Sequence, residues 1–379
     1  MNNRSTRTGV IAAGLFGMVL ASSAIAQTTV RASSWHPPKH PGVVGGYEPF
    51  IKYVEEKSGG SLEFKLWTGG SLLGPQDMLP GVQNGIADIG VLALTYFQAE
   101  FPYAQLLSNL GMLSDNPPAI AAAVTEMVML ECEPCRAEYA DLGLVFTSAY
   151  STTPYVMISR DKLDAPEDLE GKTYRSAGTV WDRYVEYVGG TPVNVSSAEI
   201  FEALDRGGVD AAVFAASGLE SFSLWDVADY VNMLPLGTYA AMSLFTMNRG
   251  FWGDLTDEER RVMLDGAAIG AVRVTQGYID SDKRALNQAE EHGVTVVQPS
   301  DALRAQLAEF LEQDLLGLEK IAAERYNIDD AAHWIAKFRV LLEKWKGISA
   351  ANNGDPDMMI QAMRDEIYSK VDEATYGLQ

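Results

Sequence analysis

Residues 168–190 read DLEGKTYRSAGTVWDRYVEYVGG and contain the repeating unit of an α/β fold. A β-rich run, Lys172–Ser176, follows a glycine, and a helical pattern over Trp181–Val188 ends at a pair of glycines. A helix over Ala198–Asp205 and a strand over Val209–Phe214 come next along the chain. Strands that alternate with helices in this way predict a mainly parallel sheet with helices on both of its faces.

The same alternation extends in both directions from this stretch. Toward the N-terminus, apolar or alternating runs predict strands at 28–33, 62–67, 89–94, 144–148 and 155–159. Helical patterns lie between them, at 45–57, 76–84 and 119–142. Beyond Thr256 the chain is predicted to be mainly helical, with a short strand at 294–297 and helices at 257–276, 281–292, 302–346 and 356–371. We therefore predict an α/β protein with two sheet-containing halves and extra C-terminal helices.

Composition narrows the classes of function. The chain has 379 residues, and its 51 acidic and 29 basic side chains leave a net charge of −22. This length is enough for two or three domains. The charge argues against nucleic acid and anionic membranes as partners, because both need basic patches. Two cysteines and four histidines are too few for a disulfide framework or a Cys/His metal cluster, and no cofactor or metal is expected.

The first 26 residues have the three parts of a secretory signal peptide. Arg4 and Arg7 lie in a basic start, Val10–Leu20 is apolar, and Ala24-Ile25-Ala26 supplies small residues before Gln27. The apolar run is shorter than the roughly 20 residues that span a membrane, which disfavours a transmembrane anchor. We predict cleavage after Ala26 and export.

Cys132 and Cys135 form a Cys-x-x-Cys pair, a spacing that also occurs in thioredoxin-like redox sites. Acidic neighbours in Glu-Cys-Glu-Pro-Cys disfavour a reactive thiolate, so we predict a structural pair that can close in an oxidising compartment. His36 and His40 have the spacing of two metal ligands on one helical face. Three nearby prolines prevent a helix there, and the two histidines are predicted to be loop residues.

Several motifs, in consistent order over roughly residues 28–335, resemble those of the solute-binding proteins of tripartite ATP-independent periplasmic (TRAP) transporters. The resemblance implies a two-lobed periplasmic-binding-protein fold of the class II type, with a mainly parallel sheet in each lobe and a long helix spanning the lobes. It also implies a periplasmic receptor that is not an enzyme. The motifs are Gly70–Gly74 with Val82–Gly90, Asp168–Arg175, Glu199–Leu204 with Gly208–Ala211, and Asn248–Leu255.

Arg175 is the residue on which the functional prediction depends. It ends a β-rich run, and the small residues 176–178 leave room beside it. An arginine in this setting can bind a carboxylate through two parallel hydrogen bonds, or it can form a structural salt bridge with Asp182 or Glu202. In the TRAP family the matching arginine binds the carboxylate of the solute, so the resemblance favours a binding role.

Aromatic side chains and one histidine follow several predicted strands, where an open α/β sheet binds its ligands. Any one of them can equally be a core residue, but as a set they predict a cleft with apolar or stacking walls. The predicted binding residues besides Arg175 are Trp35, His36, Tyr96, Phe97, Tyr150, Tyr155, Trp181, Phe214 and Tyr239.

Two positions depart from relatives that bind dicarboxylates or sialic acids. Tyr155 stands where several relatives have a second arginine, and the stretch Phe214–Ser217 lacks the family's usual asparagine. We therefore expect a small organic acid and favour a monocarboxylate with an apolar, aromatic or cationic remainder. The resemblance also implies the membrane permease subunits of a TRAP transporter as partners.

Two other functions stay open from sequence. One is a receptor for an ABC transporter or a sensor domain. The other is an exported hydrolase with Asp88 and Asp210 as acid and base, although both have the setting of turn residues before strands, and hydrolase motifs are absent from the sequence. The expected lobes are residues 27–152 with about 241–280, and about 153–240 with about 281–379; residues 1–26 are the signal peptide.

Overall fold

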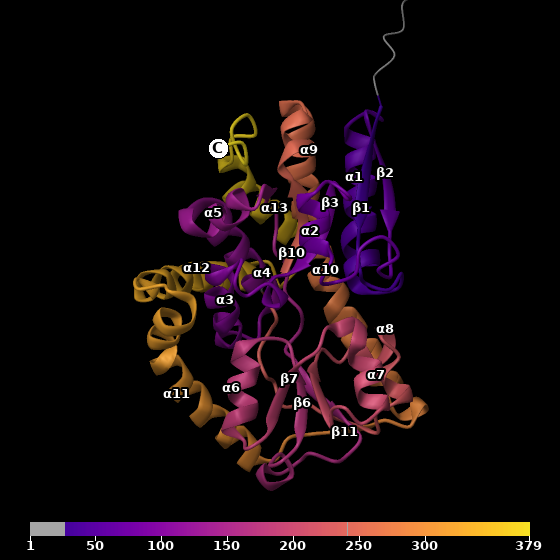
Figure 1. Ribbon diagram of the computed structural model, residues 1–379, viewed down its shortest axis with the longest axis vertical. Helices are drawn as coiled ribbons and strands as arrows, with labels where there is room; N and C mark the ends of the chain where they lie inside the picture. Colours follow the sequence, from indigo (N-terminus) through magenta and orange to yellow (C-terminus); the bar gives the residue numbers. More distant parts are fainter. Residues whose placement is uncertain (1–26, 241) are drawn as a thin grey trace, which may run out of the picture.

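The computed structural model describes residues 27–240 and 242–379, so the predicted signal peptide lies outside the described residues. Two sheets lie one above the other along the long axis of the molecule, each flanked by helices (Figure 1). The first sheet has the order β2-β1-β3-β10-β4 and the second the order β11-β9-β5-β8-β6-β7. Among the described residues, no helix is long and apolar enough to cross a membrane.

One strand in each sheet runs against the others. In the first sheet β10 is antiparallel to both of its neighbours, and in the second β5 is antiparallel to both of its neighbours. The remaining strands of each sheet share one direction, so the prediction of two mainly parallel sheets is confirmed. The strands are β1 Thr28–Ser33, β2 Leu62–Trp67, β3 Ile89–Ala93, β4 Leu144–Val145, β5 Val156–Ser159, β6 Thr173–Ser176, β7 Thr191–Asn194, β8 Ala211–Phe214, β9 Tyr230–Asn232, β10 Met242–Asn248 and β11 Thr295–Val297.

Helices cover both sheets and connect them. The short ones are α1 Glu48–Lys57, α2 Met78–Gln83, α3 Pro102–Asn109, α4 Pro117–Glu126, α5 Glu133–Asp141, α6 Thr179–Tyr187, α7 Ile200–Asp205, α8 Gly218–Ser221 and α9 Arg249–Asp254. The longer C-terminal ones are α10 Asp257–Gln288, α11 Asp301–Tyr326, α12 Ala331–Ala351 and α13 Pro356–Glu366.

Helix α10 is one continuous helix of 32 residues, about 48 Å long (Figure 1). It packs against α1 beside the first sheet and against α8 beside the second. The predicted break after residue 276 is therefore wrong. Gly277 does not end the helix; it faces Pro41 and Gly45, where the chain packs closely on α10. At Gly270 a Cβ atom would come within 2.4 Å of the Phe245 ring, so glycines on this face allow α10 to approach the first sheet.

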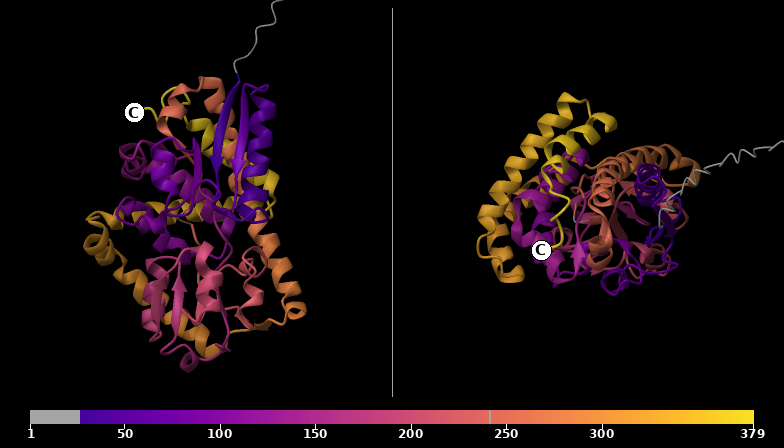
Figure 2. Two further views of the ribbon diagram at one scale, coloured as in Figure 1. Left: turned by 45° about the vertical axis from the view of Figure 1, so that its right-hand side comes forward. Right: turned by 90° about the horizontal axis from the view of Figure 1, so that it is seen from above.

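The C-terminal helices differ from the expected pattern in their number and in the part of the molecule on which they pack. Asn327 adopts a left-handed conformation with φ 55°, which divides the single helix predicted over 302–346 into α11 and α12. Helix α12 packs on α4, where the indole Nε1 of Trp345 donates to Glu126 at 2.6 Å, and α13 packs on α10. Figure 2 shows these yellow helices along one side of the molecule. We propose that α12 and α13 belong with the first lobe; the other lobe boundaries stay predictions.

Candidate functional site

A cavity lies between the two sheets, at the carboxyl ends of strands from both. Its residues come from the segment after β1, from the end of β3 and the segment after it, and from the two connections that cross between the sheets. Others come from β6 and the residue that follows it, from β8, from the segment after β7 and from the interior of α10. This is the edge at which open α/β sheets bind ligands. The lining residues are Trp35, His36, His40, Ala93, Tyr96, Tyr150, Thr152, Tyr155, Arg175, Ala177, Ser197, Phe214, Tyr239 and Tyr278.

The structure brings eight of the ten predicted binding residues to this cavity and leaves two outside its lining. Trp181 stands behind the wall: its ring stacks on that of Tyr239 with centroids 5.8 Å apart, and its Nε1 donates to the Leu236 carbonyl at 2.7 Å. Phe97 is buried next to Tyr96 without lining the cavity.

Four polar lining residues were missed as binding residues by sequence reasoning: His40, Thr152, Ser197 and Tyr278. The sequence pattern marks His40 only as a possible metal ligand or loop residue, and Ser197 only as the residue that precedes the helix predicted over 198–205. Tyr278 lies in the interior of α10, more than one hundred residues after Arg175, and no local pattern marks it. Its hydroxyl lies 3.2 Å from Nε2 of His40.

Arg175 is the charged group of this cavity, and its side chain is buried, with 1% of the residue exposed. Strand β6 places it between β7 and β8. Nε donates to the Val195 carbonyl at 2.8 Å, Nη1 to the Val213 carbonyl at 3.1 Å and Nη2 to the Tyr96 hydroxyl at 3.4 Å. Its guanidinium also lies 5.2 Å from the centre of the Phe214 ring. All of these partners are neutral.

The two acids considered as salt-bridge partners of Arg175 have other partners. Asp182 accepts a hydrogen bond from the Ser176 hydroxyl, and Glu202 pairs with Arg206 at 3.3 Å on the exposed face of α7. Among residues 27–240 and 242–379, no carboxylate forms an ion pair with Arg175. The described part of the chain therefore leaves a buried cation without an anion.

The two histidines of the cavity are neutral. Their rings stack with centroids 4.0 Å apart. Burial lowers the pKa of His40 to about 3 and holds the pKa of His36 well below its usual range, with a smaller contribution from His40. The described residues contain no cluster of three or more His, Cys, Asp or Glu side chains that could hold a metal.

Aromatic rings form most of the remaining wall. Tyr155 and Tyr239 stack with an interplanar angle of 15°. Tyr150 stacks on Tyr278, and its buried hydroxyl has no hydrogen-bond partner within the described residues. The free space is about 20 Å³, room for roughly one water molecule, so an organic acid enters only when the walls separate.

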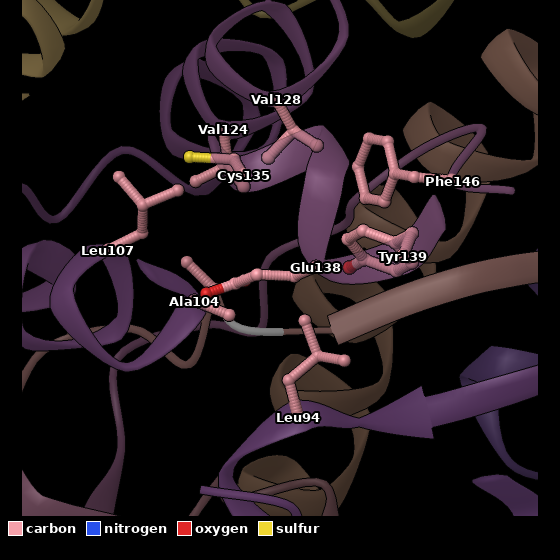
Figure 3. Close-up of a pocket in the computed structure, with 10 residues that line it drawn as sticks. Leu94, Ala104, Leu107, Val124, Val128, Cys135, Glu138, Tyr139 and Phe146 are labelled. Carbon is pink, nitrogen blue, oxygen red and sulfur yellow. The ribbon is translucent and has the colours of Figure 1, made fainter. Parts of the chain in front are cut away.

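Two other hollows have different characters. A groove of about 360 Å³ lies between α5 and the C-terminal residues, and Arg136 beside it donates to the Val128 and Met129 carbonyls. Figure 3 shows a smaller hollow of about 10 Å³, walled mainly by apolar side chains, in which the Glu138 carboxyl points toward Ala104. Neither lies at the carboxyl ends of strands from both sheets.

The hydrolase alternative fails on geometry. Asp88 precedes β3 and accepts hydrogen bonds from the backbone N–H and the Nε of Arg31, at 2.7 and 3.0 Å. Asp210 precedes β8 and accepts from the Thr173 N–H at 2.7 Å. Both acids therefore lie at the amino ends of strands, in different sheets, at the edges opposite to the cavity.

Residues 32–320 match the family described as bacterial extracellular solute-binding protein, family 7, or DctP. The chain belongs to this family. It is a TRAP periplasmic solute-binding protein, and such proteins are receptors rather than enzymes. A solute-binding protein of Albidiferax ferrireducens is 22% identical over 83% of this chain and 84% of its own length.

Two solved structures show the same fold as this family-7 protein. One is a TRAP solute-binding protein from a marine metagenome, specific for aromatic acids and in complex with metahydroxyphenylacetate. It is 20% identical, with a TM-score of 0.74 over 84% of this chain and 99% of its own. The other, from Rhodoferax ferrireducens, contains copurified benzoate; it is 19% identical, with a TM-score of 0.74 over 85% of this chain and 100% of its own.

Proposed function

We propose that this protein captures a small monocarboxylic acid in the periplasm and delivers it to the membrane permease of a TRAP transporter, with the carboxylate bound by Arg175. The observation that carries the proposal is the buried guanidinium, whose partners in the described chain are all neutral oxygens. A buried charge is costly unless it is paired, and a carboxylate is the partner whose geometry fits the guanidinium.

The hydrogen bonds of Arg175 suggest how the acid binds. Nε is taken by Val195, and Nη1 and Nη2 each have one N–H to spare. A carboxylate would therefore approach the end of the guanidinium that carries Nη1 and Nη2. Lysine cannot offer this pair of parallel donors, which is why the residue type matters here.

The walls favour a flat or apolar remainder for the acid. Phe214 lies against the guanidinium, and Tyr155 and Tyr239 line the same cavity. The two histidines add no charge. Arg175 is the single lysine or arginine among the lining residues of the described chain. A second carboxylate would therefore lack a cation there, and a monocarboxylate fits better than a dicarboxylate. The Tyr150 hydroxyl belongs to the lining and has no hydrogen-bond partner within the described residues, so we expect it to bind one polar substituent. The two aromatic acids bound by the similar structures support this class.

Binding would require the two sheets to move apart and close again. The small free volume means that the sheets move apart to admit the acid and close on it afterwards. We place the hinge in the two connections between the sheets and in α10. Closure is driven by the higher affinity of the closed form for the acid.

Export and processing complete the proposal. Cleavage after Ala26 would give a mature chain that begins at Gln27, which immediately precedes β1. N-terminal sequencing of protein recovered from the periplasm is expected to start at Gln27. An intact Met1 on that protein would contradict the processing step.

The binding proposal is tested by identifying the acid. Mass spectrometry of small molecules released from the denatured purified protein is expected to find a monocarboxylate. A thermal-shift series then compares benzoate, metahydroxyphenylacetate and mandelate with succinate and with neutral benzamide. We expect at least one aromatic monocarboxylate at 100 times its Kd to stabilise the fold by about 2.7 kcal/mol, with little effect of benzamide. The proposed ligand class would be overturned if succinate stabilised the fold more than the aromatic acids do. It would also be overturned if none of the acids stabilised the fold.

A further inference from the structure

The hydroxyl oxygen of Tyr96 lies between two hydrogen-bond donors, Arg175 on β6 of the second sheet and Ser197 after β7. Tyr96 ends the short helical turn Leu94–Tyr96 after β3, in the first sheet. Its oxygen accepts from Nη2 of Arg175 at 3.4 Å and from the backbone N–H of Ser197 at 2.9 Å. It also lies 3.5 Å from the Ser197 hydroxyl. One neutral oxygen thus bonds to a buried cation and to a backbone donor from another segment.

This set of donors suits an anionic oxygen better than a phenol. A guanidinium N–H and a backbone N–H bind a carboxylate oxygen with charge-assisted hydrogen bonds, which are about twice as strong as neutral ones. The Ser197 hydroxyl can also donate to a carboxylate by rotating its proton. Tyr96 lines the cavity and is only half-buried, so its ring has room to turn away when the sheets separate.

We propose that Tyr96 is an internal stand-in for one oxygen of the bound carboxylate, and that the backbone N–H of Ser197 joins Arg175 in binding that oxygen once Tyr96 has been displaced. The proposal rests on the proposed function and adds two positioning groups to it. While Tyr96 holds the site, it links the first sheet to the second and satisfies part of the Arg175 guanidinium. Neutral solutes cannot replace this contact, so Tyr96 raises selectivity for acids.

The sign of the Tyr96→Phe effect separates this role from an ordinary ligand contact. Removing the competing hydroxyl is expected to tighten binding of the aromatic monocarboxylate by about three- to tenfold, because the hydrogen bonds from Arg175 and Ser197 to the phenol oxygen no longer have to be broken. If the Tyr96 hydroxyl instead donated to the bound acid, the same variant would bind more weakly. Tyr103→Phe is the matched control, since Tyr103 lies on α3 outside the cavity and packs against Trp334.

Ser197 is tested in the Tyr96→Phe background, where the competitor is already absent. Ser197→Pro removes the backbone N–H at the first position of a 3-10 turn, and the preceding residue already has ψ 154°, as a residue before proline requires. We expect it to weaken acid binding about tenfold or more, whereas Ser197→Ala, which keeps the N–H, stays within about threefold.

Calorimetry of these variants with benzoate, or with the monocarboxylate that binds the wild type best, decides the matter. Weaker or unchanged binding by Tyr96→Phe, or full binding by the Ser197→Pro double variant, would overturn the stand-in role while leaving the receptor function intact. Failure of every monocarboxylate to bind the wild type would overturn the receptor proposal itself, and this one with it. Circular dichroism confirms that each variant is folded.

Discussion

Arg175 and Arg183 lie eight residues apart and have opposite surroundings, although both side chains are largely shielded from solvent. Arg183 on α6 forms a two-pronged ion pair with Asp314 on α11, with its Nη2 2.7 Å from Oδ2, and the two side chains are 11% and 10% exposed. Its Nη1 also donates to Asn109 at 3.0 Å. Arg175 on β6 has only neutral oxygens around it in the described chain.

The difference separates an arginine that is paired within the fold from the arginine to which we assign solute binding. Asp314 lies between the buried positions Phe310 and Leu318 of α11, and it fixes that helix against α6. The charge of Arg183 is therefore balanced within the fold. No carboxylate of the described chain balances the charge of Arg175. In the proposed function, a bound carboxylate would do for Arg175 what Asp314 does for Arg183. Four predictions test this difference. They concern the two arginines, the Glu138 carboxyl and the Cys132–Cys135 pair.

The largest effect is expected at Arg175. Arg175→Ala should weaken acid binding by about two to four decades, or about 3–5 kcal/mol, because the carboxylate is left desolvated and unpaired. Arg175→Lys keeps the charge but loses the paired donors, and should lose at least about tenfold. Calorimetry measures the affinities, and Arg206→Lys on the exposed face of α7 is the control. Near-normal binding of the acid with a lowered melting temperature would show that Arg175, like Arg183, has a structural role.

Arg183 should give the opposite pattern. Arg183→Met leaves Asp314 buried without its partner and should destabilise the fold by about 3 kcal/mol. The double variant Arg183→Met, Asp314→Leu should recover most of this loss, since a well-packed apolar pair can replace a buried ion pair. Urea unfolding measures stability, and calorimetry of the folded variants should give affinities within about threefold of the wild type. A loss of affinity for the acid without a loss of stability would contradict the purely structural role of Arg183.

Glu138 is the converse case, a buried carboxyl without a cation in the described chain. It accepts a hydrogen bond from the Tyr103 N–H, while its Oε2 has no partner there. Burial raises the pKa of Glu138 to about 8, against opposing backbone hydrogen bonds. The native state therefore keeps a proton that the unfolded chain loses near pH 4.5, and stability falls as pH rises from about 4.5 to 8.

Glu138→Gln should remove this dependence. We expect the variant to gain about 1 kcal/mol per pH unit on the wild type across that window, with no gain below pH 4.5. Urea unfolding at pH 4.5, 6 and 8 measures it, with Glu202→Gln on the surface as control. Equal slopes for variant and wild type would show that the Tyr103 and Ala104 N–H groups keep Glu138 ionised.

The smallest effect is expected at the cysteine pair. The structure shows Cys132 and Cys135 joined in a disulfide at the start of α5, buried and away from the cavity at Arg175. Replacing both by serine should leave the affinity for the acid within about twofold, because neither residue touches the binding site. A tenfold loss of affinity in calorimetry would show that α5 helps to shape the cavity. The binding site would then depend on groups beyond those around Arg175.

Local pattern predicted much of the secondary structure. The strands at 28–33 and 62–67 are confirmed with their full bounds, and that at 89–94 within one residue, because strict alternation or complete burial marks them. The helix after Arg175 is confirmed within two residues at each end. Strands β7, β9 and β10 were not predicted. β10 is the reversed strand of the first sheet, and its pairing partners lie about one hundred and more residues away in sequence.

The sequence by itself determined the family, the two mainly parallel sheets and Arg175 as the candidate binding group, since motifs and periodicity are properties of short segments. Only the tertiary structure decided that Asp182 and Glu202 have other partners, that Tyr278 of α10 and Ser197 reach the same cavity, and that Tyr96 bonds to Arg175. The physical reason is that the state of a buried charge depends on every group packed around it. Those groups come from segments 20 to 79 residues away from Arg175, and no local pattern records their approach.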